Sequence, residues 1–186
     1  KLQCFLQNTT MIELHQAMQY SLIENGGSRW RPLLVYYTTV ALNTDLAKAD
    51  DAAAAIECIH AYSLVHDDLP AMDDDDFRRQ KPSCHRAYNE STAILAGDCL
   101  SNMAFEILSS EDNSNPETLS NKQRLELTKT LAQAAGARGM AYGQALDLAA
   151  TNNHQQNQKV PAEININNIE NIHYYKTGCL FAAAMK

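Results

Sequence analysis

The chain has 186 residues, enough for one sizeable domain, and its 22 acidic and 15 basic side chains give a net charge of −7. Six aspartates crowd into residues 67–76, and the other 16 acidic residues nearly balance the bases, so no basic stripe indicates a nucleic-acid partner. No stretch of about 18 apolar residues predicts a membrane span, and no signal peptide is visible.

The five cysteines are odd in number, dispersed, and without the paired spacing of a metal site. This usage is typical of reduced thiols, so we expect a cytoplasmic protein. The chain starts at Lys1 without a methionine and stops at Lys186 in an alanine-rich segment that has no glycine or proline stop. We therefore expect a single all-helical domain over residues 1–186 whose C-terminal helices are missing.

Apolar residues at helical spacing predict a first helix around Met11–Leu22, which Gly26 and Gly27 end. Pro32 suits the first turn of a second helix that reaches Val40. Further helices are expected at about residues 50–68, 89–108, 117–150 and from 162 onward, the last with Ile169, Ile172 and Tyr175 on one face. Loops are expected at about residues 70–86, 109–116 and 151–159. Since no β-alternation persists and no long repeat occurs, the sequence predicts an all-α fold.

The most informative segment is the acidic run Asp67–Asp76, which Arg78 and Arg79 follow. Crowded carboxylates repel one another unless cations share the site, and bound divalent metal is the simplest explanation. The planar fork of arginine suits a phosphate or a carboxylate. A solvated acidic loop is the plain alternative, whereas an EF-hand would need glycine at its sixth and glutamate at its twelfth position. The pattern favours a metal–diphosphate site.

His60, Leu64 and Asp67 share one face of the third helix because they are spaced i, i+4 and i+7. At about 1.5 Å per residue, His60 lies about 10 Å from Asp67 along that face. We expect Asp67, Asp68 and Asp73 to point into one cavity and to supply oxygen ligands to several Mg²⁺ ions. A lone histidine on a helix is more often a core residue, and only the face shared with Asp67 argues otherwise here.

An ordered set of motifs runs along the chain: Gly26–Pro32, Glu57–Asp68, the Asp-Asp-x-x-x-x-Asp spacing before Arg78-Arg79, Ala96-Gly97-Asp98, Gly143–Leu148 and Lys176-Thr177-Gly178. This set resembles the trans-polyprenyl diphosphate synthase family, and within it the bacterial farnesyl diphosphate synthases most closely. The resemblance covers about Met18 to Ala184, and an ordered set of this length is highly specific.

The resemblance implies an isoprenoid synthase-type helical bundle around a central cavity, usually in a homodimer. It also implies a Mg²⁺-dependent reaction, with Mn²⁺ as a substitute ion. An allylic diphosphate, dimethylallyl or geranyl, ionises, and isopentenyl diphosphate attacks the cation to give farnesyl diphosphate and pyrophosphate. Because metals neutralise the leaving diphosphate, the protein would contribute positioning and electrostatics rather than a nucleophile.

The same resemblance implies a role for each matching residue. The metal ligands would be Asp67, Asp68 and Asp73. The allylic diphosphate would be held by Arg78, Lys176 and Thr177, of which Arg78 and Lys176 join the aspartates in catalysis. Isopentenyl diphosphate would be held by Gly27, Ser28, Arg31, His60 and Arg79. The residues that reach metal-bound water would be Gln144 and Asp147. Taken singly, Lys176 is an ordinary surface lysine, the glycine pair ends a helix, and Gln144 and Asp147 pair with helix neighbours.

Tyr62 lies five residues before Asp67, about 7.5 Å deeper along the same helix. Its bulk, with Ser63 beside it, is expected to form the floor of the pocket for the growing chain, and the resemblance gives these positions the same role. We therefore expect a fifteen-carbon product, and a twenty-carbon geranylgeranyl synthase is the alternative.

Two departures from the family pattern favour a rival hypothesis, a non-catalytic subunit of a heteromeric prenyltransferase. Ser28 stands where the family has lysine, which predicts weaker binding of isopentenyl diphosphate unless Arg29 or Arg31 compensates. The family's second aspartate-rich motif lies downstream of Lys176, and this sequence does not reach it. The intact aspartates and arginines favour the enzyme. A metal-buffering protein or a terpene cyclase would have no need of Arg31 and His60.

Overall fold

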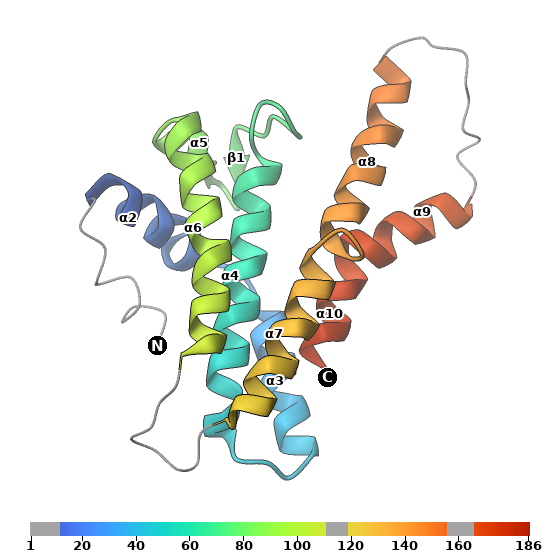
Figure 1. The fold of residues 1–186 in the computed structure, drawn as a ribbon. Coiled ribbons are helices and arrows are strands. Elements are labelled where there is room, and N and C mark those ends of the chain that lie inside the picture. The colour runs from blue at the N-terminus through green and yellow to red at the C-terminus, as the bar shows by residue number, and fades with distance from the viewer. Residues whose placement is uncertain (1–11, 111–118, 156–165) are drawn as a thin grey trace.

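A computed structural model describes residues 12–110, 119–155 and 166–186, and most of them are helical (Figure 1). The α-helices are α2 (Ile12–Gln19), α3 (Trp30–Ala41), α4 (Ala49–Asp67), α5 (Cys84–Ala87), α6 (Glu90–Ser109), α7 (Asn121–Ala135), α8 (Met140–Gln155), α9 (Ile166–His173) and α10 (Cys179–Ala184). In the same parts of the chain lie two π-helices, η1 (Tyr20–Glu24) and η3 (Tyr174–Gly178), and a 3₁₀ turn, η2 (Leu46–Lys48). The predicted all-α class is confirmed.

Helix α4 is the central element, and it packs against both α3 and α6 (Figure 1). Its residues 53–59 are all buried, including three consecutive alanines and the apolar Cys58 and Ile59. A helix that is buried on every side is a core helix rather than an amphipathic surface helix. Small alanine side chains let the neighbouring helices approach closely, so α4 is a fixed support for the groups at its C-terminal end.

Backbone hydrogen bonds fold the acidic loop back onto the end of α4. The Asp68 N–H donates to the Leu64 carbonyl at 3.2 Å, and the Asp73 N–H donates to the Asp67 carbonyl at 2.9 Å. The loop is therefore a compact extension of the helix, which brings Asp73 next to Asp67 in spite of the five residues between them in the chain.

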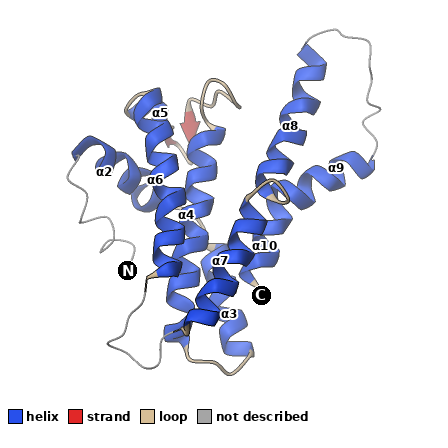
Figure 2. Ribbon diagram, viewed as in Figure 1, coloured by secondary structure: helices blue, strands red, loops and turns tan. Residues whose placement is uncertain are grey.

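One short hairpin interrupts the segment that was expected to be only a loop. Strand β1 (Phe77–Arg78) pairs antiparallel with β2 (Lys81–Pro82), and Figure 2 shows them as the strands beside α5 and α6. The turn residues Arg79 and Gln80 have φ values of 53° and 69°. Two positive φ values at the centre of a two-residue turn match the twist of a hairpin. Strands of two residues are too short to show an alternating pattern in a sequence.

The single helix expected over residues 117–150 is wrong, because the structure has two helices, α7 and α8, there. The break lies at residues 136–139. A Cβ on Gly139 would overlap the carbonyls of Gln133 and Ala134, so only glycine permits this close turn. Helix α8 then runs on to Gln155, into the stretch expected as a loop at 151–159. The rest of that stretch, and the helix start expected near Ala162, lie outside the described residues.

Within the described ranges, no helix is both long enough and apolar enough to cross a membrane. The thiols of Cys58, Cys84, Cys99 and Cys179 are free, as predicted from their spacing. The fifth cysteine, Cys4, lies outside the described residues.

Candidate active site

A cavity of about 450 Å³ lies along the C-terminal half of α4, facing α8 and η3. Eight of the residues predicted from the sequence line it: Arg31, His60, Tyr62, Ser63, Asp67, Gln144, Lys176 and Thr177. Much of the remaining wall is apolar, with Leu64, Met72, Met140 and Leu148 among its residues. A concave site with an apolar wall and a few convergent polar groups suits a ligand that has a charged head and a hydrocarbon tail.

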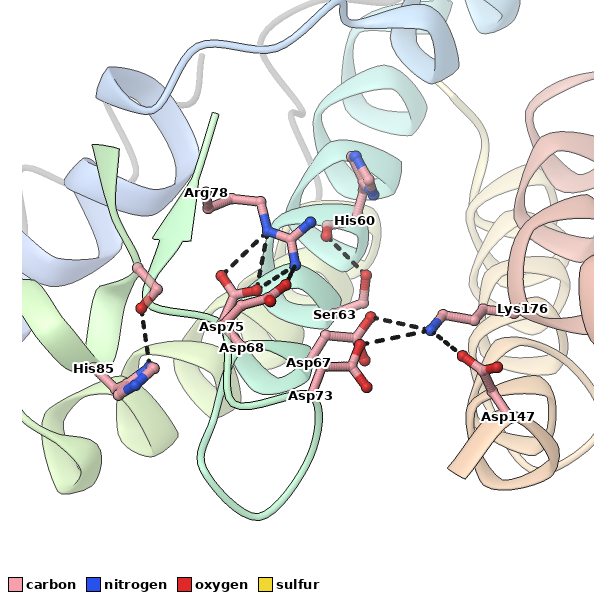
Figure 3. Close-up of polar contacts among 11 residues, drawn as sticks. His60, Ser63, Asp67, Asp68, Asp73, Asp75, Arg78, His85, Asp147 and Lys176 are labelled. Atoms are coloured by element: carbon pink, nitrogen blue, oxygen red, sulfur yellow. Dashed lines mark hydrogen bonds and ion pairs between the residues drawn. The ribbon is translucent and has the colours of Figure 1, made fainter. Parts of the chain in front are cut away.

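Lys176 is the common partner of three carboxylates at one rim of the cavity (Figure 3). Its Nζ donates to Asp147 Oδ2 at 2.6 Å and lies 3.9 Å from both Asp67 Oδ2 and Asp73 Oδ2. Burial raises the pKa of Asp67 to about 6, the Lys176 ammonium opposes that rise, and the Asp73 carboxylate adds to it. Because this rim has three carboxylates and one ammonium, it favours the binding of further cations.

Of the three aspartates expected to point into one cavity, Asp67 alone lines it, and Asp73 lies beside it near Lys176. Asp68 is oriented differently. Its side chain is almost fully buried and is held by Arg78, whose Nε donates to Asp68 Oδ1 at 2.9 Å and whose Nη2 forms a second bond to the same carboxylate. Arg78 Nη2 also lies 3.2 Å from Asp75 Oδ2. A buried carboxylate needs donors, and the arginine fork supplies two of them, so Asp68 is oriented toward Arg78 rather than toward Lys176.

The donor set at this rim fits Mg²⁺ in its chemistry. Carboxylate oxygens of Asp67 and Asp73 converge on one ammonium, and Mg²⁺ typically takes one or two carboxylates together with phosphate oxygens and water. Among the residues that the structure describes, no group of three or more His, Cys, Asp or Glu side chains lies close enough together to hold one ion. Asp67 and Asp73 are therefore suited to supply the one or two carboxylates of such a Mg²⁺ site.

The hairpin turn docks on the glycine pair at the other side of the site. Arg79 Nη1 donates to the Gly26 carbonyl at 2.5 Å, and Lys81 Nζ donates to the Glu24 carbonyl at 2.7 Å. Gly27 has a φ of 119°, and a Cβ there would overlap the Arg79 guanidinium. Glycine at this position is therefore required for Arg79 to lie over the loop.

Arg29 and Glu57 form a partly buried ion pair that sequence reasoning missed. Glu57 is only 3% exposed, and Arg29, with a φ of 54°, also donates to the Leu22 carbonyl at 2.7 Å. The two residues are 28 positions apart, so no local spacing joins them. The sequence feature that could have indicated this pair is Glu57 itself, a charged residue inside an apolar stretch of α4. Because Arg29 is committed to Glu57, it is not available to compensate for Ser28, which is exposed.

Several polar groups inside the cavity have no partner. In the described part of the chain, the buried Nε of Arg31 and both amide atoms of Gln144 make no hydrogen bond. The Arg31 guanidinium lies over the Phe181 ring at 4.5 Å. Burial, and after it the nearby guanidinium groups of Arg31, Arg79, Arg29 and Arg78, together lower the pKa of His60 to about 3. The unpartnered donors of Arg31 and Gln144, beside the further positive charge of Arg79, are the features of a site that receives an anion.

Comparisons with known proteins agree with this geometry. Residues 12–186 match the Polyprenyl synthetase family. The chain is 50% identical over 173 residues to the farnesyl diphosphate synthase of Haemophilus influenzae, covering 93% of this chain and 54% of that protein. It is 48% identical over 180 residues to the Escherichia coli farnesyl diphosphate synthase, covering 97% of this chain and 55% of the relative.

Solved structures show the same similarity in three dimensions. A geranyltransferase from Legionella pneumophila superimposes with a TM-score of 0.87 at 38% identity, over 99% of this chain and 61% of that one. A geranyltranstransferase from Thermotoga maritima gives a TM-score of 0.80 at 34% identity, over 98% of this chain and 61% of the other. The chain thus spans about half the length of the curated relatives it matches.

Proposed function

The chain belongs to the polyprenyl synthetase family, and from this we propose that it takes part in condensing isopentenyl diphosphate with dimethylallyl or geranyl diphosphate to give farnesyl diphosphate and pyrophosphate. The observation that carries the proposal is the cavity itself. It has carboxylates around Lys176 at one rim, an Arg31 guanidinium with an unpartnered Nε inside, and an apolar wall for a prenyl tail.

Asp67, Asp68 and Asp73 would hold Mg²⁺, or Mn²⁺ as a substitute. Ions held there would supply positive charge to the allylic diphosphate, which would make it a better leaving group. In support, Asp67 and Asp73 already share one cationic partner. Asp68 is held by Arg78, so its contribution depends on that arginine turning toward the diphosphate instead.

The chain's own residues would position the reacting groups. Lys176, Thr177 and Arg78 would bind the allylic diphosphate, and Gln144 and Asp147 would orient the water around the ions. The allylic carbon–oxygen bond breaks with its electron pair on the diphosphate. The double bond of isopentenyl diphosphate forms the new carbon–carbon bond, and the proton that is lost goes to the departing diphosphate. Holding both substrates in this order replaces the need for a nucleophilic side chain.

Isopentenyl diphosphate would lie against Arg31, His60 and Arg79, beside the Gly27–Ser28 loop. Arg31 and Arg79 supply positive charge, and a neutral His60 supplies a hydrogen bond. The prenyl tail would run along α4 from Asp67 toward Tyr62 and Ser63, which also line the cavity. On this proposal, Tyr62→Ala lengthens the product.

The test is a product assay on the protein made from its complete reading frame. It is incubated with Mg²⁺, isopentenyl diphosphate and geranyl diphosphate, and the prenyl alcohols are identified after dephosphorylation. A fifteen-carbon alcohol that disappears in Asp67→Asn supports the proposal. Absence of any condensation product from the folded protein contradicts it.

A second candidate is a subunit that binds a catalytic partner, which Ser28 favours. In that case the purified protein binds Mg²⁺ and pyrophosphate but gives no product until the partner is added. We also propose a homodimer, on the resemblance alone, and light scattering of the purified protein gives its mass directly.

A further inference from the structure

His66 is a cavity residue to which the proposed function gives no role. It lies one residue before Asp67 and one helical turn beyond Tyr62 on α4. The two rings meet edge to face, with centroids 5.6 Å apart and planes at 83°. Both side chains line the cavity. His66 contacts the Tyr62 ring and lies between Tyr62 and Asp67 along α4.

A notch in α6 holds His66 in place. Helices α4 and α6 lie side by side along most of their lengths (Figure 1). His66 Nε2 lies 3.0 Å from the Ile94 carbonyl and 3.8 Å from Asp98 Oδ1. Gly97 faces the imidazole directly, and a Cβ at that position would overlap Nε2 and Cδ2 of the ring. The carbonyl is an acceptor, so Nε2 carries a proton and donates to it.

We propose that His66 is a positioning residue for chain length, which fixes the Tyr62 ring across the prenyl pocket by anchoring it to α6. This inference rests on the proposed function. An edge-to-face pair restricts the orientation of both rings, and the hydrogen bond to Ile94 joins that pair to a second helix. The floor of the pocket is then a Tyr62–His66 unit seated on Gly97, rather than Tyr62 by itself.

The first test is the ratio of twenty- to fifteen-carbon product made by the complete protein. His66→Ala raises this ratio about fivefold. In the Tyr62→Ala background, His66→Ala changes it by less than about twofold, since the ring it positions is gone. An unchanged ratio in active His66→Ala, or full additivity with Tyr62→Ala, overturns the inference. If wild-type protein makes no product, it is the proposed function that fails.

The second test needs no turnover. Gly97→Ala displaces the imidazole, so it lowers the melting temperature by several degrees in wild type and much less in His66→Ala. Glu106→Ala, an exposed change on α6, is the matched control and leaves both melting temperatures unchanged. If Gly97→Ala lowers the melting temperature equally in both backgrounds, Gly97 does not hold the His66 ring, and the inference is wrong. Should His66→Ala not fold, His66→Leu replaces it, because leucine fills the space without the edge contact or the hydrogen bond.

Discussion

Among single residues, His60 is the one on which burial and charge act most strongly in the same direction. Its pKa falls to about 3 because the side chain is buried and four arginines lie near it, with Arg31 the largest charge contribution. The imidazole is therefore neutral in the folded protein at any pH above about 3. In the unfolded chain an ordinary histidine titrates near 6.5.

This difference predicts a pH dependence of stability. A group with a lower pKa in the folded state binds its proton more readily when unfolded, so its effect is absent above pH 6.5 and destabilises the fold as the pH falls toward 3. Between pH 6.5 and 4.5 we expect wild type to lose on the order of 1–2 kcal/mol relative to His60→Asn. Urea unfolding of both proteins at the two pH values measures this. Parallel losses in the two proteins would show that His60 titrates normally.

Ser28 is the residue where added charge is expected to help. It is exposed beside Gly27, and Arg29 is committed to Glu57. We expect Ser28→Lys to lower the KM for isopentenyl diphosphate about tenfold, because a hydrogen bond to a charged group is stronger than one from a hydroxyl. Ser110→Lys, which adds the same charge at the end of α6, is the control and keeps the wild-type KM. A KM that stays the same in both variants contradicts the prediction.

Among the elements, π-helix η3 depends on one close helix contact. A Cβ on Gly143 of α8 would overlap the backbone of Tyr175 and Lys176. This contact lets η3 lie against α8 and puts the Lys176 ammonium within 2.6 Å of Asp147. A π-turn of this kind often marks a functional position in a helix.

We expect Gly143→Ala to push η3 away from α8 and to lower the melting temperature by several degrees, as overpacking typically does. Gly178→Ala is the matched control, because its Cβ would meet the Tyr174 ring at 3.6 Å and the His173 carbonyl at 3.8 Å, both ordinary contact distances. Thermal unfolding followed by circular dichroism compares the two. A melting temperature that drops equally in both variants would mean that helix propensity, and not the contact, is responsible.

The elements also show which parts of the fold the sequence could predict. Alanine-rich, apolar-periodic segments such as the one around Ile56 are helical as expected. The break between α7 and α8 was missed because residues on both sides favour helix, and the glycine that ends the pattern is needed only for a contact with the preceding helix. The hairpin was missed because its turn is set by positive φ at Arg79 and Gln80, residues that do not signal one.

The candidate site was predictable where local spacing decides geometry. Helical spacing put His60 and Asp67 on one face of α4, and both line the cavity together with Tyr62. It could not predict the division of the aspartates between Lys176 and Arg78, nor the Arg29–Glu57 pair, because these contacts join segments that only the tertiary fold brings together.

For the whole molecule, the opposed charges at the site predict that metal and diphosphate bind together. Mg²⁺ alone competes with Lys176 for Asp67 and Asp73, and pyrophosphate alone meets those carboxylates. We expect Mg²⁺ and pyrophosphate together to raise the melting temperature by more than the two separate shifts combined, as mass action requires of linked ligands. Differential scanning fluorimetry measures it. Asp67→Asn is expected to reduce the shift with both ligands to the sum of the two separate shifts, whereas the surface change Glu126→Gln keeps the larger shift. If the shifts in wild type are simply additive, metal and diphosphate do not bind together as predicted.

The buried central helix α4 has a further consequence for the length of the pocket that runs along it. Residues 53–59 are enclosed on all sides, so the helix cannot slide to accommodate a longer tail. One helical turn is about 5.4 Å, close to the extended length of one five-carbon unit. One turn below Tyr62 lies Cys58, which is fully buried. Each condensation adds one whole five-carbon unit, so on the proposed function the product would lengthen by about one unit for each turn of α4 that is cleared.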